Sequence, residues 1–181
     1  MLAYLFVLLA IAARFLVLQI QPHPWHFTPV AASLLFFGAY GSRRQLWIPL
    51  ALFAAADVAL TKVVYSYAFG WDHFVTWAWY AAILLLGTRL RDNSKPLWVI
   101  VSALASSVSF FLISNFAAWA AYDMYPKTLA GLMTSYTLAL PFFRGTLTSD
   151  LLFTSAFFAV PVIIRQLSHT SGKNSGSATA A

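Results

Sequence analysis

Apolar runs separated by short polar loops make up almost the whole chain. The runs cover residues 1–20, 28–41, 46–64, 74–88, 96–121 and 147–164. A helix needs about 20 mostly apolar residues to cross a bilayer, so the pattern predicts an all-α membrane protein with six transmembrane helices. We expect these helices to form one domain, 1–167, followed by a disordered cytoplasmic tail, 168–181, which is polar.

The stretch between the fifth and sixth runs is less hydrophobic and is expected not to cross. We expect residues 127–143 to form a partly helical outer loop that covers the outer mouth of the bundle. Pro141 would end this cover, and Gly145 would let the backbone turn into the last helix. If residues 127–140 crossed instead, the chain would have seven spans and its tail would lie outside.

Basic residues cluster on one side of the six predicted helices. Seven of the eleven Lys and Arg residues share that side: Arg43, Arg44, Arg89, Arg91, Lys95, Arg165 and Lys173. Loops rich in Lys and Arg remain in the cytoplasm. The sequence therefore predicts that both termini are cytoplasmic.

Composition strengthens the membrane prediction. Hydrophobic residues make up 61% of the chain, charged residues only 9%, and the mean hydropathy is +0.75, which is more apolar than a soluble domain of this length. The net charge of +6 lies largely in loops, where it sets orientation, so we expect no nucleic-acid partner. The chain has no Cys, which excludes disulfides and thiolate metal sites.

Two charged residues stand inside predicted spans. Asp57 lies in the third run and Arg14 in the first. A charge at the centre of a membrane helix costs about 2.5–3.5 kcal/mol on insertion scales and needs a partner. We predict a buried ion pair between Arg14 and Asp57, with Lys62 as the competing partner. A proton or cation relay, or contact with a ligand, is the alternative role.

The predicted outer face carries most of the unusual polar and aromatic chemistry. Asn115, Trp119 and Tyr122 follow the i, i+4, i+7 spacing of one helical face. This face is predicted to line a substrate pocket together with residues of the outer loops: Trp25, His26, Trp71, Asp72, His73 and Trp77. The alternative is that Trp119 and Tyr122 are interfacial belt residues.

The stretch "PFFRGTLTSDLLF" brings an Arg and an Asp close to the last span. We expect Asp150 in the first turn of the last helix, where its charge meets the positive end of the helix dipole. Thr148 or Ser149 would cap that turn. Arg144 and Asp150 would face the pocket from opposite sides of the turn, or else form a structural clasp.

Small residues recur every four positions, a spacing that lets helices approach closely in lipid. They are Gly38 and Ser42 in the second run, and Ala51, Ala55 and Ala59 in the third. These residues are predicted to pack inside the bundle or to form a docking surface for a partner. A serine stripe on the fifth run is expected to bond to a neighbouring backbone: Ser102, Ser106 and Ser109.

Enzymatic motifs are weak. Neither G-x-x-x-x-G-K nor G-x-G-x-x-G occurs, and we expect no cofactor and no metal site. A membrane enzyme that uses outer-face His and Asp residues, including a zinc site built from His23, His26, His73 and Asp72, is the weakest interpretation.

Two longer stretches resemble a known family of transport proteins. "FTPVAASLLFFGAYGSRRQLWIPLALFAAADVAL" and "LALPFFRGTLTSDLLFTSAFF" resemble the second, third and sixth helices of the substrate-binding S components of energy-coupling factor (ECF) transporters. The chain is also similar to an uncharacterised bacterial membrane family in which "FTPVAA", "NFAAW", "YPKTLAG" and "LPFFRGTLTSDLL" recur. One departure is Ala10-x-x-x-Arg14, where S components commonly have Ala-x-x-x-Ala for docking.

The S-component resemblance implies a function. It implies a six-helix bundle in a bacterial inner membrane that captures a small, aromatic or heterocyclic solute at the outer face. Its partners would be lipid, the solute, a transmembrane coupling subunit and ATPase subunits on other chains. The alternative function is a non-transporting scaffold of the rod-shape-protein type, which binds other membrane proteins through its helix faces.

Overall fold

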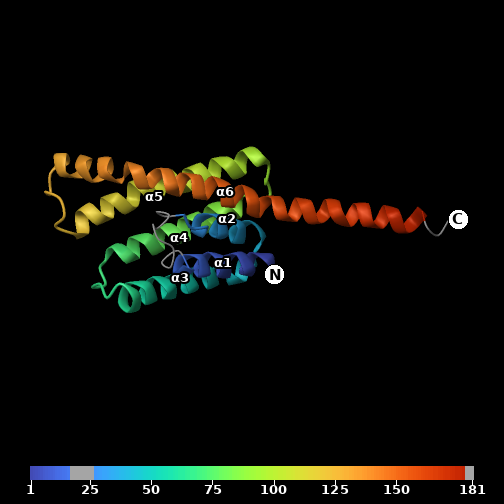
Figure 1. Ribbon diagram of the computed structural model, residues 1–181, viewed down its shortest axis with the longest axis horizontal. Coiled ribbons are helices and arrows are strands. Elements are labelled where there is room, and N and C mark those ends of the chain that lie inside the picture. The colour runs from blue at the N-terminus through green and yellow to red at the C-terminus, as the bar shows by residue number, and fades with distance from the viewer. Residues whose placement is uncertain (17–26, 178–181) are drawn as a thin grey trace.

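The computed structural model describes residues 1–16 and 27–177, and these residues are all-helical (Figure 1). The α-helices are α1 (Leu2–Leu16), α2 (Val30–Tyr40), α3 (Trp47–Ala59), α4 (Asp72–Arg89), α5 (Pro96–Ala121) and α6 (Leu129–Ser177). A 3₁₀ turn, η2 (Arg43–Gln45), precedes α3, and a π-helical segment, η3 (Leu60–Val64), follows it. The all-α class and the positions of the first five helices agree with the hydrophobic pattern.

Successive helices run in alternating directions, with α2 at the centre of the bundle (Figure 1). α2 packs against α1, α4, α5 and α6. It is apolar on every side and its residues from Ala31 to Ala39 are all buried, as expected of a helix surrounded by others. The loops 65–71 and 122–128 lie together at one end of the bundle, which we call the distal end.

Three helical stretches are long and apolar enough to cross a membrane: Arg43–Val64, Pro96–Ala121 and Leu129–Ser168. α1 and α2 are also apolar but shorter. Large apolar side chains face outward along these elements, among them Leu97, Leu104, Val108 and Leu112 on α5. A continuous apolar exterior suits lipid as the solvent.

α2 and α4 touch at two glycines. A Cβ atom on Gly38 would lie 2.8 Å from Gly87 Cα, and one on Gly87 would lie 2.9 Å from Leu35 Cα. Only a residue without a side chain allows the two backbones to come this close. The predicted close approach therefore exists at Gly38, which meets a glycine on α4, whereas Ser42, the other small residue of the pattern, is exposed.

Arg91, just beyond α4, binds the end of α2. Its Nε donates to Gly38 O over 2.7 Å and its Nη2 donates to Gly41 O over 2.5 Å. The last carbonyls of a helix have no partner within the helix, and a cation there is also favoured by the helix dipole. Arg91 thus fixes the end of α2 as well as contributing positive charge.

The prediction that residues 127–143 form a loop over the outer mouth is wrong. α6 is one helix from Leu129 to Ser177, and both Pro141 and Gly145 lie inside it. Residues 129–143 do not cover the bundle but pack along α5, where Tyr136 Oη donates to Leu112 O over 2.9 Å. Backbone groups in lipid must be paired internally, which favours an unbroken helix even through proline.

The predicted helix start at Asp150 is therefore also wrong. Asp150 lies in the interior of α6, far from either helix end. Thr148 Oγ1 donates to Arg144 O and Ser149 Oγ donates to Thr28 O, so neither hydroxyl caps a helix.

Two smaller expectations also differ from the structure. Ala51 and Ala55 are exposed on α3 and do not pack inside the bundle. α6 remains helical to Ser177, so the first part of the predicted disordered tail is helical.

Candidate functional site

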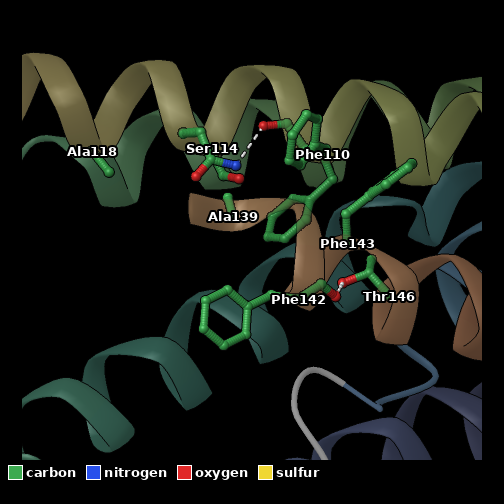
Figure 2. A pocket seen from close by; sticks show the side chains of 9 residues that line it. Phe110, Ser114, Ala118, Ala139, Phe142, Phe143 and Thr146 are labelled. Carbon is green, nitrogen blue, oxygen red and sulfur yellow. Dashed lines mark hydrogen bonds between the residues drawn. The ribbon is translucent and has the colours of Figure 1, made fainter. Parts of the chain in front are cut away.

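A hollow of about 250 Å³ lies between α5 and α6, towards the distal end (Figure 2). α5 supplies Phe110, Phe111, Ser114, Asn115 and Ala118. α6 supplies Ala139, Phe142, Phe143 and Thr146. Four phenyl rings and two alanines make most of the lining apolar, and the three polar side chains give it a small hydrogen-bonding capacity.

Two of the three polar side chains of the hollow, Asn115 and Thr146, are held by their own helices. Asn115 Nδ2 donates to Phe111 O over 2.8 Å, and Thr146 Oγ1 donates to Phe142 O over 3.4 Å (Figure 2). No contact between described residues engages the side-chain carbonyl oxygen of Asn115, so it is free to accept a hydrogen bond from a solute. An apolar hollow with a few fixed polar groups is the usual form of a small-molecule site.

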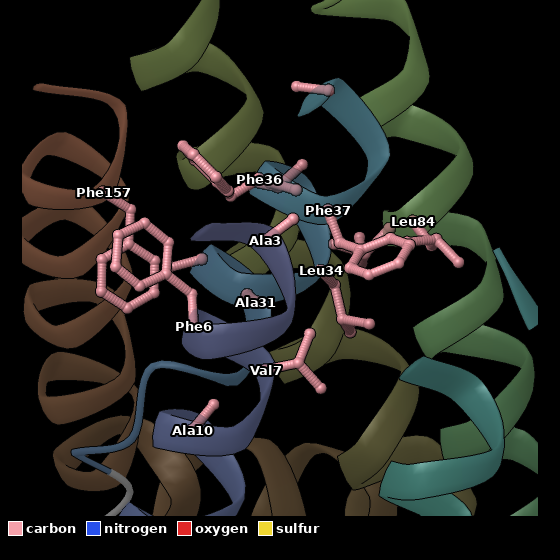
Figure 3. Close-up of a cluster of buried hydrophobic side chains, with 14 of the residues drawn as sticks. Ala3, Phe6, Val7, Ala10, Ala31, Leu34, Phe36, Phe37, Leu84 and Phe157 are labelled. Carbon is pink, nitrogen blue, oxygen red and sulfur yellow. The ribbon is translucent and has the colours of Figure 1, made fainter. Parts of the chain in front are cut away.

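Towards the end of the bundle opposite the distal end, which we call the proximal end, aromatic side chains fill the interior (Figure 3). The rings of Phe6 on α1 and Phe157 on α6 stack with centroids 3.9 Å apart, and Phe36 on α2 meets Phe6 edge-on at 4.8 Å. These side chains are all buried. These rings fill the space between α1, α2 and α6, about three turns along α6 from Thr146 of the hollow.

Asp72, His73 and Tyr122 meet at the distal end, as the sequence predicts for residues of one site. Tyr122 Oη donates to Asp72 Oδ1 over 3.0 Å, and that oxygen lies 3.5 Å from His73 Nδ1. Burial and the Asp72 carboxylate together raise the pKa of Tyr122. This polar rim links the start of α4 to the end of α5, one turn beyond Ala118 of the hollow.

His73 is also tied to the π-helical segment. Its Nδ1 lies 3.1 Å from Gly70 O and its Nε2 lies 2.9 Å from Thr61 Oγ1. Because a carbonyl only accepts, Nδ1 must carry a proton, and neutral His73 then accepts from Thr61 at Nε2. π-helical turns are frequent at functional sites, and this one brings Thr61 to the rim.

The predicted Arg14–Asp57 ion pair forms. Arg14 Nη1 lies 2.5 Å from Asp57 Oδ1. Asp57 also accepts from Trp77 Nε1 over 2.9 Å and from Tyr80 Oη over 3.4 Å. The pair thus joins α1, α3 and α4, and Lys62 takes no part in it. Two opposite charges that neutralise each other, with two neutral donors completing the hydrogen bonds of the carboxylate, fit a structural role.

Other residues predicted for the site lie apart from it. Trp25 and His26, like His23, lie outside the described residues. Trp71 is largely exposed. Trp119 Nε1 donates to Pro126 O over 2.9 Å, with Lys127 Nζ 5.8 Å from its ring centroid, so Trp119 holds the 122–128 loop and does not line the hollow.

Arg144 and Asp150 do not bracket a turn. Six residues apart on one continuous helix, they point about 120° away from each other. Arg144 is exposed, whereas Asp150 is buried and lies 2.6 Å from Ser107 Oγ on α5. Only Arg144 remains near the hollow, two residues before Thr146.

Sequence reasoning missed several partners. Tyr80 follows Trp77 by one turn, so an i, i+3 rule could have placed it beside Asp57. Ser106 and Ser109 of the serine stripe donate to the backbone of their own helix and not to that of a neighbour, and the contact with α4 comes from the side chain of Trp79, whose Nε1 donates to Ser109 Oγ over 2.9 Å. Ser107 and Thr154 gave no signal, since isolated hydroxyl residues are common in membrane helices.

No group of three or more His and Asp side chains gathers anywhere in the described part of the chain. Asp72 and His73 are the one close pair of these types there. A zinc site takes at least three ligands from the protein, and the other two residues of that interpretation, His23 and His26, lie outside the described residues, so it stays untested.

The fold and its apolar exterior define a helical membrane protein with a hollow between two of its helices. The chain belongs to a family of unknown function, DUF6580, whose sequence profile matches residues 1–171. Searches of curated proteins and of solved structures gave no match, so neither links the chain to S components.

Proposed function

We propose that this protein is a solute-binding membrane subunit, similar in role to an S component, that captures a small aromatic or heterocyclic compound. The hollow between α5 and α6 is the observation that carries the proposal. Its phenyl rings offer faces and edges against which a planar ring can pack. Asn115 would accept a hydrogen bond from the solute and so orient it.

The proposal includes a topology of six crossings with both termini cytoplasmic. It is supported by the alternating helix directions and by the loop arginines Arg43, Arg44 and Arg91, which lie at the end opposite the distal loops. In this orientation the distal end faces outside. The hollow would then fill from the outer face of a bacterial inner membrane.

The rim of Asp72, His73 and Tyr122 would lie at the outer mouth of this path. Its hydrogen bonds between the start of α4 and the end of α5 hold those helices in place beside the hollow. A solute that displaced Tyr122 from Asp72 would loosen this link. Transport through such a subunit would need a coupling subunit and ATPase subunits on other chains, because this chain carries no nucleotide-binding loop.

The test is whether the purified protein retains a small molecule that depends on the hollow. The wild type, Ala139→Trp and Ala156→Trp would be purified in lipid nanodiscs and their extracts compared by mass spectrometry. Ala139 lines the hollow, whereas Ala156 is exposed on the same helix and is the matched control. We expect a compound that is recovered with the wild type and the control and is lost from Ala139→Trp.

Two results would contradict the proposal. One is that no compound accompanies the wild type above the level of the nanodisc lipids. The other is that Ala139→Trp retains the same compound in the same amount.

A scaffold function is the second candidate, favoured by the exposed face of α3. Ala51 and Ala55 lie one turn apart there and are exposed, with Trp47 a turn before them. Small residues at this spacing suit close contact with another membrane helix. Crosslinking through Ala51→Cys in the native membrane would test this: a specific protein adduct supports a scaffold, and lipid adducts alone oppose it.

A further inference from the structure

Asp150 is a buried carboxyl group that forms no ion pair with any described residue. It is 3% exposed and sits on α6 against α5. Its hydrogen-bond partner is Ser107 Oγ, 2.6 Å from Asp150 Oδ2. Asp57, the other buried Asp of the described chain, has an arginine beside it. A positive partner therefore stabilises the charged form of Asp57, and no such partner is described for Asp150.

Among the residues that the structure describes, none offers Asp150 a compensating charge. α5 carries no titratable residue from Pro96 to Ala121, and α2 carries only Tyr40, whose ring packs on Phe158, two turns from Asp150. On α1, Arg14 is engaged by Asp57, and Tyr4 donates to Gln45. On α6 itself the nearest is Arg144, which is exposed and faces elsewhere.

Asp150 also lies near the middle of the membrane. Ser149 Oγ bonds to Thr28 O just before α2 begins. α2 then takes 11 residues, about 16 Å, to reach the proximal loops. This is half of a hydrocarbon core of about 30 Å. An unpaired carboxylate at this depth is strongly disfavoured, and such groups neutralise by taking up a proton.

The hydroxyl of Ser107 gives an independent indication. Ser107 Oγ lies 2.6 Å from Asp150 Oδ2 and 3.2 Å from Ala103 O. Both partners accept if Asp150 is ionised, yet a serine hydroxyl has a single proton to donate. If Asp150 carries a proton, it donates to Ser107, and Ser107 donates to Ala103 O. The protonated form therefore satisfies both contacts.

A second hydroxyl points to the same place. Thr154 lies one turn after Asp150 on the same side of α6, is 1% exposed, and its Oγ1 has no hydrogen-bond partner. A buried polar group without a partner is uncommon and calls for an explanation. Thr154 Oγ1 is therefore a second oxygen near Asp150 in the same interface. A proton or a water that leaves Asp150 could bond to it.

We propose that Asp150, Ser107 and Thr154 form a proton-binding site inside the membrane, with Asp150 protonated at neutral pH. The site lies directly beneath the hollow, because Thr146 and Phe111 of the hollow are each one turn from Asp150 and Ser107. The proposal does not depend on what the hollow binds.

Infrared spectroscopy of the protein in nanodiscs tests the proposal directly. The five acidic residues of the chain are all Asp. Of these, Asp57 is ion-paired, and Asp72, Asp92 and Asp123 lie in loops or at helix ends. We expect one band of a protonated carboxyl group at neutral pH. It should disappear in Asp150→Asn and persist in Asp57→Asn.

Asp150→Asn is expected to fold, because its amide can donate to Ser107 as the protonated acid does. Ser107→Ala provides a second readout, since loss of the acceptor should shift the band without removing it. Raising the pH should remove the wild-type band. It should also lower the thermal stability of the wild type more than that of Asp150→Asn, since the folded state holds a proton that the unfolded chain releases.

Three outcomes would overturn the assignment. The band could be absent at neutral pH, or it could survive in Asp150→Asn. It could also appear only after sodium is removed, in which case the site holds a metal cation and not a proton. Should Asp150→Asn fail to fold, an unshifted band in Ser107→Ala would be sufficient to reject the proposal.

Discussion

Arg14 Nη1 on α1 lies 2.5 Å from Asp57 Oδ1 on α3, inside the bundle, although the two residues are far apart in the sequence. The contact joins a helix near the N-terminus to the helix that ends in the π-helical segment. Trp77 and Tyr80 of α4 complete the shell around Asp57. One carboxylate therefore links three helices.

We predict that Asp57→Ala destabilises the protein by about 3–5 kcal/mol, because it leaves a buried Arg14 unpaired. Arg14→Ala should cost less in the Asp57→Ala background than in the wild type, since coupled residues are not additive. Unfolding of all four forms in mixed micelles measures this cycle. Additive losses would mean that the two residues do not interact.

The glycine contact between α2 and α4 gives a second prediction. Gly38→Ala and Gly87→Ala should each lower stability by about 3 kcal/mol, at the upper end of overpacking effects, because each Cβ would meet partner backbone atoms closer than 3 Å. Ala105→Leu is the control, since Ala105 is exposed on α5. If both alanine variants unfold like this control, the helices are further apart than described.

The direction of α5 can be tested with single cysteines, because the chain has none. Asp123→Cys should react with an impermeant maleimide only from outside, and Asp92→Cys only from the cytoplasm. Asp92 is a better probe than Arg91, whose guanidinium holds the end of α2. Reaction of both from one side would mean that α5 does not cross the membrane.

Arg144 and Asp150 should differ sharply when each is replaced by alanine. Asp150→Ala is expected to cost about 1–3 kcal/mol, because it removes the buried partner of Ser107. Arg144→Ala should leave stability nearly unchanged, since the side chain is exposed. Comparable losses in the two variants, measured by thermal unfolding, would contradict this assignment of burial.

The helices and the Arg14–Asp57 pair were predictable because the membrane allows few solutions. An apolar run that crosses a bilayer forms a helix, because its backbone groups must be paired internally. A charged side chain within such a run needs a partner of opposite charge. α6 was not predictable in the same way. Pro141 and Gly145 disfavour a helix in water, whereas packing along α5 keeps this segment helical.

The hollow and the Ser107–Asp150 contact depend on how α5 and α6 align along their length. That alignment is fixed by contacts such as Tyr136 with Leu112 and Phe111 with Phe143, whose centroids are 4.8 Å apart. Hydrophobic periodicity gives the buried face of a helix but not its sliding position against a neighbour. The sequence therefore supplied Asn115 as a site residue without its partners.

The unbroken course of α6 has a mechanical consequence. Its 49 residues make a rod of about 73 Å, which passes the hollow, then Asp150, and continues beyond the bundle on the side of the N-terminus (Figure 1). A rotation of this rod at Thr146 would reappear as a rotation at Arg165. In the proposed topology this rod would connect the two faces of the membrane, so that a rotation caused by binding at the hollow would reach the opposite end through α6 alone.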